Sequence, residues 1–359
     1  MTYPNFTRLF SFVLVLCASL PATAADKSAP AVGIVLRGDH STARALSGIV
    51  RQYEASKQGK VTVQPFSTIS GLDAVNDGSA DMAASARPAM PDRAEEKGTN
   101  FYPVAWDALV PIVAAENPVS NVTLKQLHDI YLGRIDNWRD LGGPDSRINL
   151  DGAAPPLDGV EYSTRLLLFH YGDQAVSVSR MYVNVEKLEE DIALNAHGLG
   201  MSTLSGVNAN PKVKMLSVEG VRASPASIAD GSYPLYAALY IGAREDNPHH
   251  DEVAKFIAYT NSDTAKAILR KNGLVPYADA DLMARQEERV AFINAHVFAA
   301  AAVPAVAASG ETPVSAPRAT AQALQRVAPT SERTLEAKER ADRAAADKSK
   351  TKSGDDAGH

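Results

Sequence analysis

Small hydroxyl side chains and glycine follow two predicted strands of this chain, and an arginine follows a third. Those strands are Val32–Leu36, Val61–Phe66 and Asp81–Ser85. The candidate binding residues after them are Ser41, Thr42, Thr68, Ser70, Gly71 and Arg87. Hydroxyls, a guanidinium and free backbone N–H groups at helix starts are the donors that hold an oxyanion without a metal. The first chemistry to consider is therefore anion binding.

A parallel α/β sheet would bring these donors together. Each strand is followed by a polar loop and then by a helical pattern, such as the apolar stripe of Leu46, Ile49, Val50 and Tyr53. The carboxyl ends of parallel strands meet at one edge of the sheet, where ligand clefts form. The loops after the strands should therefore share a cleft.

Structural roles compete with binding at the same positions. Ser41-Thr42 can serve as an ordinary helix cap, and Thr68–Gly71 can serve as a tight strand-to-helix turn. Arg87 can face the cleft or pair with Asp81 or Asp107. The sequence leaves these alternatives open.

The most patterned stretch runs from Val122 to Ile148. Thr123 and Gln126 have the spacing of a capping box, and an apolar stripe follows to Tyr131. Gly133 stands where a left-handed residue ends a helix. We expect a short helix here, followed by a turn and a strand.

This stretch, with Asn117-Pro118-Val119 before it, resembles the PstS-like phosphate-binding proteins of ABC transporters. Weaker similarity covers roughly residues 30–280. The resemblance implies a two-lobed α/β periplasmic binding protein fold, each lobe a mostly parallel sheet flanked by helices. It also implies two crossover strands, near Trp106–Ala115 and Tyr233–Ile241. Independently, Pro103 and Pro111 interrupt the apolar stretch Phe101–Ala115, which predicts two consecutive extended segments around Trp106-Asp107.

The resemblance further implies capture of a small oxyanion, phosphate first, for an inner-membrane ABC permease. Thr42 and Thr68 fall where relatives carry ligand-contacting hydroxyls, whereas Ala86 falls where they carry a polar contact. Relatives also have a Ser-Gly-Thr at the start of a helix in the second lobe. This chain lacks it, and Ser163, Thr164 and Arg165 are the candidate substitutes. The alternative function is a binding-protein-like fold that has lost phosphate binding and serves as a periplasmic interaction or regulatory module.

Composition sets the wider context. The 359 residues carry a net charge of −6, which argues against nucleic-acid binding. The start of the chain has the pattern of a cleaved secretory signal, so we expect a periplasmic monomer. The expected divisions are 1–24 signal peptide, 30–108 and 237–298 first lobe, 109–236 second lobe, and 299–359 disordered tail. A closing helix is expected from Asp279 to Phe298.

Catalytic signatures are weak. The chain has no Gly-x-Ser-x-Gly elbow, and its histidines lack metal-ligand spacing, so we expect no enzyme, no metal and no cofactor. Asp107 and Glu161 are the acid/base pair to inspect for an enzyme on this fold.

Overall fold

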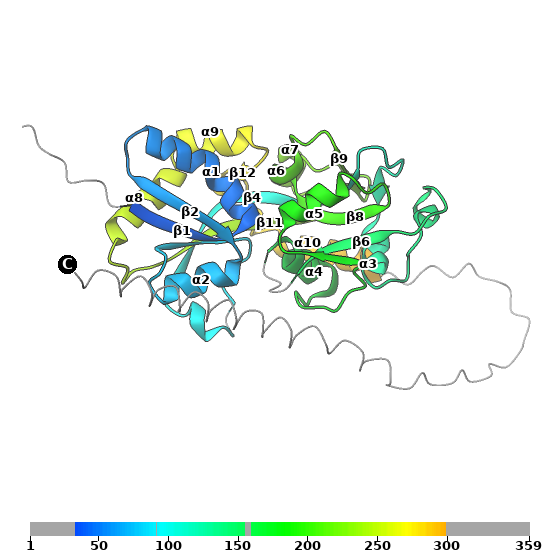
Figure 1. The fold of residues 1–359 in the computed structure, drawn as a ribbon, viewed down its shortest axis with the longest axis horizontal. Helices are drawn as coiled ribbons and strands as arrows, with labels where there is room; N and C mark the ends of the chain where they lie inside the picture. Colours follow the sequence, from blue (N-terminus) through cyan, green and yellow to red (C-terminus); the bar gives the residue numbers. More distant parts are fainter. Residues whose placement is uncertain (1–32, 91, 155–158, 299–359) are drawn as a thin grey trace, which may run out of the picture. The chain divides into compact units, whose positions relative to one another are not determined.

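The computed structural model describes residues 33–90, 92–154 and 159–298. The predicted signal peptide and tail lie outside the described residues. The first elements are β1 (Gly33–Asp39), α1 (His40–Ala55), β2 (Lys60–Phe66), α2 (Thr68–Asn76), β3 (Met82–Ser85), η1 (Ala94–Glu96) and β4 (Thr99–Ala114). They alternate strand and helix as the sequence predicts (Figure 1).

Next along the chain come β5 (Asn121–Val122), α3 (Leu124–Tyr131), η2 (Trp138–Leu141), β6 (Asn149–Ala153), α4 (Val160–Phe169), β7 (Arg180–Tyr182), α5 (Val185–Ile192), β8 (Gly198–Thr203) and α6 (Leu204–Val207). The remaining elements are β9 (Val213–Met215), β10 (Ser217–Val218), α7 (Pro225–Ala229), β11 (Tyr236–Arg244), α8 (His250–Thr260), α9 (Asp263–Lys271), β12 (Val275–Pro276), η3 (Tyr277–Asp279) and α10 (Gln286–Phe298).

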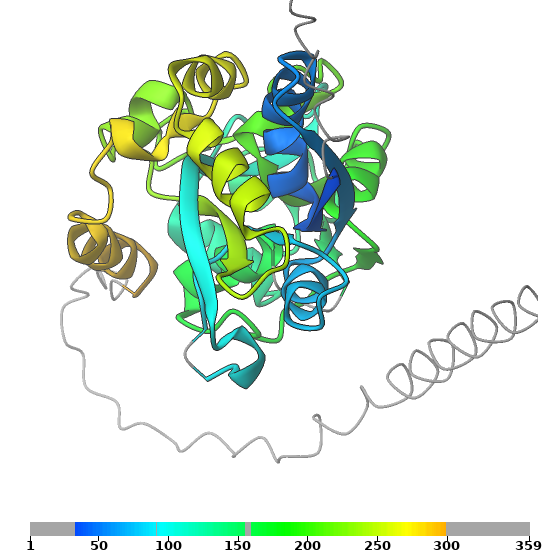
Figure 2. The ribbon, with the colours of Figure 1, turned by 90° about the vertical axis from the view of Figure 1, so that its left-hand side faces the viewer.

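The sheet of the first lobe has the order β2-β1-β3-β11-β4. β1 lies parallel to β2 and β3, and β11 is antiparallel to both β3 and β4 (Figure 2). The predicted stripe of α1 is buried, with Leu46 and Ile49 at 1% and 0% exposure. The parallel order places the ends of β1, β2 and β3, and the loops that follow them, at one edge of the sheet.

β4 links the two lobes. Its first half pairs with β11 and β12, and its second half pairs with β8 and β9. The two prolines, Pro103 and Pro111, predict two extended segments, but the structure has one strand of 16 residues. Pro103 lies at a register shift against Leu239 and Tyr240, where a residue without an N–H is tolerated. The strand therefore crosses between lobes without a break.

The second lobe confirms the most patterned stretch of the sequence. Thr123 and Gln126 form both hydrogen bonds of the capping box at the start of α3. Gly133 has a φ of +68°, as a left-handed residue after a helix requires. Trp138 is fully buried and donates its indole N–H to the carbonyl of His197 at 3.1 Å. β8, β6 and β7 complete this lobe's sheet.

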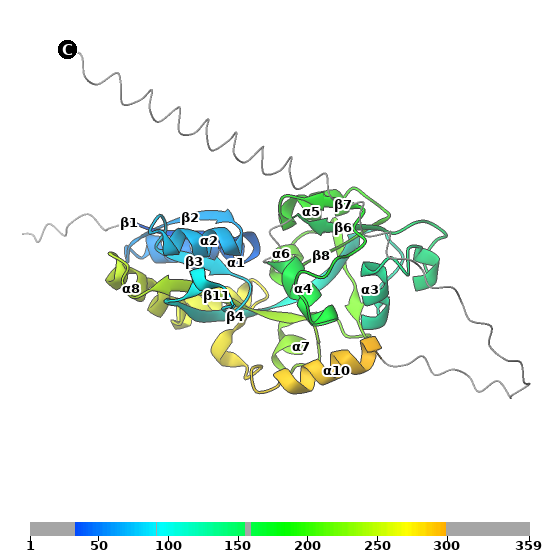
Figure 3. The ribbon, with the colours of Figure 1, turned by 90° about the horizontal axis from the view of Figure 1, so that it is seen from below.

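The closing helix differs from its prediction in two respects. α10 begins at Gln286, because residues 277–279 form a separate 3-10 turn. Its buried residues, Ile293 and Val297, belong to the second lobe's hydrophobic core, although the sequence grouped them with the first lobe. α10 contacts α3 and α4 in that lobe (Figure 3). The segment after β12 therefore returns to the second lobe.

Candidate functional site

Asp39 is the last residue of β1 and the N-cap of α1. Its Oδ1 accepts hydrogen bonds from the backbone N–H of Thr42 at 2.7 Å and from the Thr42 hydroxyl at 2.9 Å. The cap of α1 is therefore Asp39, not the Ser41-Thr42 pair that the sequence suggests. Thr42 reaches the predicted site, but both of its donors already hold a carboxylate of the same chain.

Thr68 and Ser70 are held by partners in the first lobe. Ser67 caps α2, and the Thr68 hydroxyl oxygen lies 3.5 Å from the backbone nitrogen of Ala86, which donates to it. The Ser70 hydroxyl accepts from Arg37 Nε at 3.0 Å. A side chain at Gly71 would collide with the carbonyl oxygen of Arg37, so this glycine allows α2 to approach β1 closely.

Arg87 pairs with neither Asp81 nor Asp107 in the described residues. It is 2% exposed, and it binds both carboxylate oxygens of Glu96 at 2.6 and 3.2 Å. Its remaining terminal contact is with the carbonyl of Pro88 at 2.9 Å. The partner is a residue of η1 that the sequence gave no reason to choose.

α4 of the second lobe contacts the first lobe just after β3. Gly159 precedes the helix and gives it no side-chain cap. Ser163 donates its hydroxyl to the carbonyl oxygen of Ala86 at 3.1 Å, which joins α4 to the end of β3 across the lobes. Arg165 is engaged elsewhere, by Glu161 at 2.8 Å and by the carbonyl of Gln174 at 2.9 Å.

The starts of α1 and α4 meet at the Asp39 carboxylate. A methyl group on Gly159 would come within 2.5 Å of Asp39 Oδ2, so the carboxylate lies directly against the residue that precedes α4. Asp39 is 6% exposed, and burial raises the pKa of its carboxyl above the ordinary value, although the Thr42 hydrogen bonds oppose this. Two helix N-termini thus face one negative group.

Two further candidate hydroxyls, one on α1 and one on α4, are buried. Ser41 and Thr164 are 1% and 0% exposed, and neither hydroxyl has a hydrogen-bond partner within the described residues. The sequence placed both among its candidates but gave no prominence to Asp39. The available signal was an aspartate directly after a strand and before a helical pattern, which is a preferred cap.

A family model described as "PBP superfamily domain" matches residues 23–264, which is more than half of the chain. The chain belongs to the PBP superfamily. The phosphate-binding protein PstS of Borreliella burgdorferi is 25% identical over 63% of this chain and 83% of its own length. PstS of Bacillus subtilis is 28% identical over 48% of this chain and 57% of its own length. The expected resemblance to PstS-like proteins is confirmed.

Solved structures agree with this PBP fold. A phosphate transport receptor of an ABC-type system from Vibrio cholerae aligns with a TM-score of 0.55 and 26% identity, over 67% of this chain and 99% of its own. A putative phosphate ABC transporter substrate-binding protein from Clostridium perfringens, with bound phosphate, aligns with a TM-score of 0.60 and 21% identity. That alignment spans 68% of this chain and 99% of that one. The two-lobed α/β fold with crossover strands is therefore shown.

A second contact between the lobes of this PBP fold lies beside the site. Arg44 of α1 binds both carboxylate oxygens of Glu189 of α5, each at 2.9 Å. Ser202 donates its hydroxyl to the same carboxylate. His40 lies 4.0 Å from Glu186 on α5. Arg44 and Glu189 therefore connect α1 of the first lobe to α5 of the second.

Asp107 and Glu161, the two carboxylates considered for acid/base chemistry, are held by different partners. The Asp107 carboxylate accepts from the backbone N–H and the hydroxyl of Ser205, at 3.2 and 2.5 Å. Burial raises the pKa of Asp107 to about 6. Glu161 pairs with Arg165 instead. Burial raises the pKa of Glu161, although the ion pair with Arg165 opposes this. Across the described ranges, no group of three or more acidic, histidine or cysteine side chains is placed to hold a metal.

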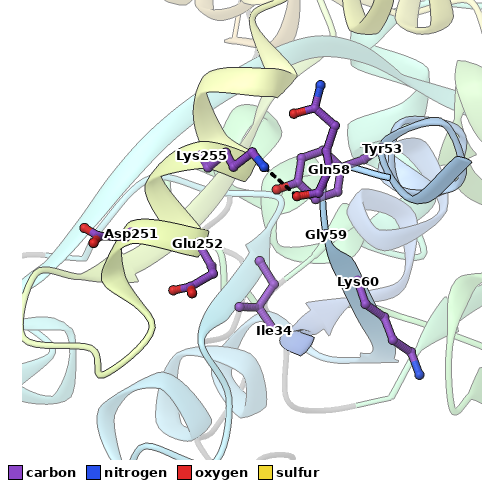
Figure 4. A pocket seen from close by; sticks show the side chains of 8 residues that line it. All are labelled: Ile34, Tyr53, Gln58, Gly59, Lys60, Asp251, Glu252 and Lys255. Atoms are coloured by element: carbon purple, nitrogen blue, oxygen red, sulfur yellow. Dashed lines mark hydrogen bonds between the residues drawn. The ribbon is translucent and has the colours of Figure 1, made fainter. Parts of the chain in front are cut away.

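A surface pocket of about 280 Å³ lies away from this site (Figure 4). Ile34 and Lys60, at the starts of β1 and β2, line it together with Lys255 of α8. Lys255 donates its ammonium to the carbonyl of Gln58 at 2.6 Å. Because the candidate site lies at the opposite, carboxyl ends of the same strands, this pocket has no part in it.

Among helices of the described residues, none is long and apolar enough to cross a bilayer.

Proposed function

We propose that this chain is the solute-binding component of an ABC transporter and captures a small oxyanion, phosphate before others, outside the inner membrane. The observation that carries the proposal is the meeting of α1 and α4, from different lobes, at one buried negative group. Helix N-termini bind anions through free N–H groups and the helix dipole. Two helix starts that already meet one carboxylate in this way favour negative charge between them.

The ligand donors that we propose are the hydroxyls of Ser41, Thr42, Thr68, Ser163 and Thr164, together with N–H groups at the two helix starts. All five side chains are at most 7% exposed. Ser70 and Gly71 shape the first turn of α2, which begins at Thr68. Arg87 and Arg165 act indirectly, because each is already bound by a glutamate.

The relatives support the ligand and the partner. Two of them are named as phosphate-binding proteins, and the Vibrio cholerae neighbour is described as a phosphate transport receptor. We infer a periplasmic monomer that delivers its ligand to an inner-membrane permease. The signal pattern at the start of the chain agrees with export.

Calorimetric titration of the purified full chain with inorganic phosphate tests the proposal. The protein is first unfolded and refolded in phosphate-free buffer, which removes carried-over ligand. We expect a Kd of roughly micromolar, about −8 kcal/mol. No heat and no thermal shift with phosphate, sulfate or other small oxyanions would overturn it.

A second function is favoured by one observation. Asp39 already takes the donors of Thr42, and the region around the start of α4 lacks the Ser-Gly-Thr that the resemblance to PstS-like proteins implies. A PBP fold whose cleft is filled by its own side chain would serve as an interaction or regulatory module. Phosphate-independent binding of a protein partner by the refolded chain, with no oxyanion binding, would support this function.

A further inference from the structure

The Asp39 carboxylate occupies the position where an anion would gain most from the fold. Oδ1 receives two donors from Thr42, at 2.7 and 2.9 Å. Oδ2 lies against Gly159, which precedes a ten-residue helix that has no side-chain cap. This arrangement uses both oxygens of the carboxylate, one for each lobe.

Two buried hydroxyls on the same two helices lack a hydrogen-bond partner in the described residues. Ser41 and Thr164 are buried beyond nine-tenths, and their hydroxyls have no partner in the described part of the chain. They belong to α1 and α4, the same two helices that meet at Asp39. A tetrahedral oxyanion has four oxygens to offer, whereas a carboxylate has only two. The Asp39 carboxylate takes the two donors of Thr42 and leaves the hydroxyls of Ser41 and Thr164 without an acceptor.

We propose that Asp39 sets the affinity of this site by acting as an intramolecular competitor of the bound oxyanion. The inference rests on the proposed function. An oxyanion enters only after the carboxylate rotates away or takes up a proton, because two anions cannot share the same desolvated donors. The bound oxyanion then receives the Thr42 donors and the free hydroxyls of Ser41 and Thr164. Burial, which raises the pKa of Asp39, agrees with such a neutralised state.

Charged neighbours do not cancel this competition. His40 and Arg44 of α1 favour the ionised form of Asp39 through their charge. Arg44 is itself bound by Glu189, and no cation contacts Asp39 among the hydrogen bonds and ion pairs of the described residues. Removing the Asp39 charge should therefore free donors for a ligand.

The test compares phosphate titrations of the wild-type full chain, Asp39→Asn, Asp39→Ser and Asp145→Asn. Asparagine and serine both keep a capping oxygen for α1, so the helix start survives. Asp145 is 72% exposed in its side chain, and its change to asparagine removes the same charge away from the site. Thermal denaturation checks that all four proteins fold.

We expect Asp39→Asn and Asp39→Ser to bind phosphate roughly tenfold or more tightly than wild type, with Asp145→Asn unchanged. Binding by these two variants alone, with a silent wild type, would support competition by Asp39 but would overturn oxyanion capture by the natural chain. Equal affinities of wild type and both Asp39 variants would overturn it and leave the proposed function intact, as would weaker binding by both. Phosphate binding by none of the folded proteins would overturn the inference and the proposed function together.

Discussion

Arg44 and Glu189 join the two lobes through a pair of parallel hydrogen bonds, each 2.9 Å long. Burial alone would lower the pKa of Arg44, but the Glu189 carboxylate outweighs it and raises that pKa. The Glu189 side chain is only 9% exposed. The contact is therefore stronger than an ordinary surface ion pair, and it favours the arrangement in which α1 and α5 meet.

Replacing Glu189 with glutamine should open the ligand-free protein. Glutamine leaves the Arg44 guanidinium without its charged partner, at a cost of about 2 kcal/mol to the closed form. Small-angle X-ray scattering of the phosphate-free chain should then give a larger radius of gyration than wild type. Glu190→Gln is the matched control, because Glu190 is an exposed residue of the same helix that pairs with Lys187. Identical scattering of Glu189→Gln and wild type would contradict this role.

Replacing Glu96 with glutamine should destabilise the protein without changing its ligand affinity. Arg87 and Glu96 have side chains that are 1% and 2% exposed, so the change leaves a buried guanidinium unpaired. We expect a loss of about 3 kcal/mol or more in the free energy of unfolding, measured by chemical denaturation. The Kd for phosphate should stay within roughly threefold of wild type. A large loss of affinity at unchanged stability would place Arg87 in the binding site after all.

Asp107 should make the stability of the fold depend on pH. Its pKa is raised to about 6 in the folded protein from 3.8, so the folded state holds this proton more tightly than the unfolded state does. The contribution favours folding below about pH 4 and is lost as the pH rises through 6, by about 3 kcal/mol. Asp107→Asn should flatten that decline in denaturation curves measured from pH 4 to 7, and Asp145→Asn should not. Equal slopes for wild type and Asp107→Asn would show that Asp107 stays ionised.

Gly159→Ala should disturb the meeting of the lobes. The added methyl would lie 2.5 Å from Asp39 Oδ2, so either the carboxylate or the start of α4 must move. We expect a stability loss of about 1–3 kcal/mol, together with altered phosphate affinity. Gly33→Ala is the control, since a methyl there meets only the Lys60 side chain, at 3.9 Å. A Gly159→Ala protein that matches wild type in both measurements would mean that Asp39 and α4 are not in contact in solution.

Local patterns predicted the elements well, because they depend on neighbours in the sequence. The capping box of Thr123 and Gln126 and the buried stripe of α1 need only spacing to be seen. The predicted start of the last helix, Asp279, was wrong, because α10 begins at Gln286. The apolar pattern continues into residues that instead form η3 and a turn before Gln286.

The partners of the site residues could not be predicted in the same way. Glu96 lies nine residues from Arg87, and no periodicity marks it as the partner. Asp39 and Ser41-Thr42 are all good capping residues, so their order alone does not say which one caps α1. The approach of Asp39 to Gly159 depends on how two lobes close, which a single sequence does not encode locally. Whether the nine candidate residues bind a ligand stays a prediction.

The pairing of β11 and β12 with β3 and β4 also constrains how the chain folds. The first lobe's sheet needs strands at residues 236–244 and 275–276, whereas β3 ends at Ser85. Until those strands are made, a growing chain exposes the unpaired edge of β3 and the first half of β4. The strands β6, β7 and β8, together with the second half of β4 that β8 pairs with, come from one uninterrupted stretch of chain. The sheet of the second lobe can therefore assemble before α10 joins it, whereas the sheet of the first lobe must wait for a long loop to close.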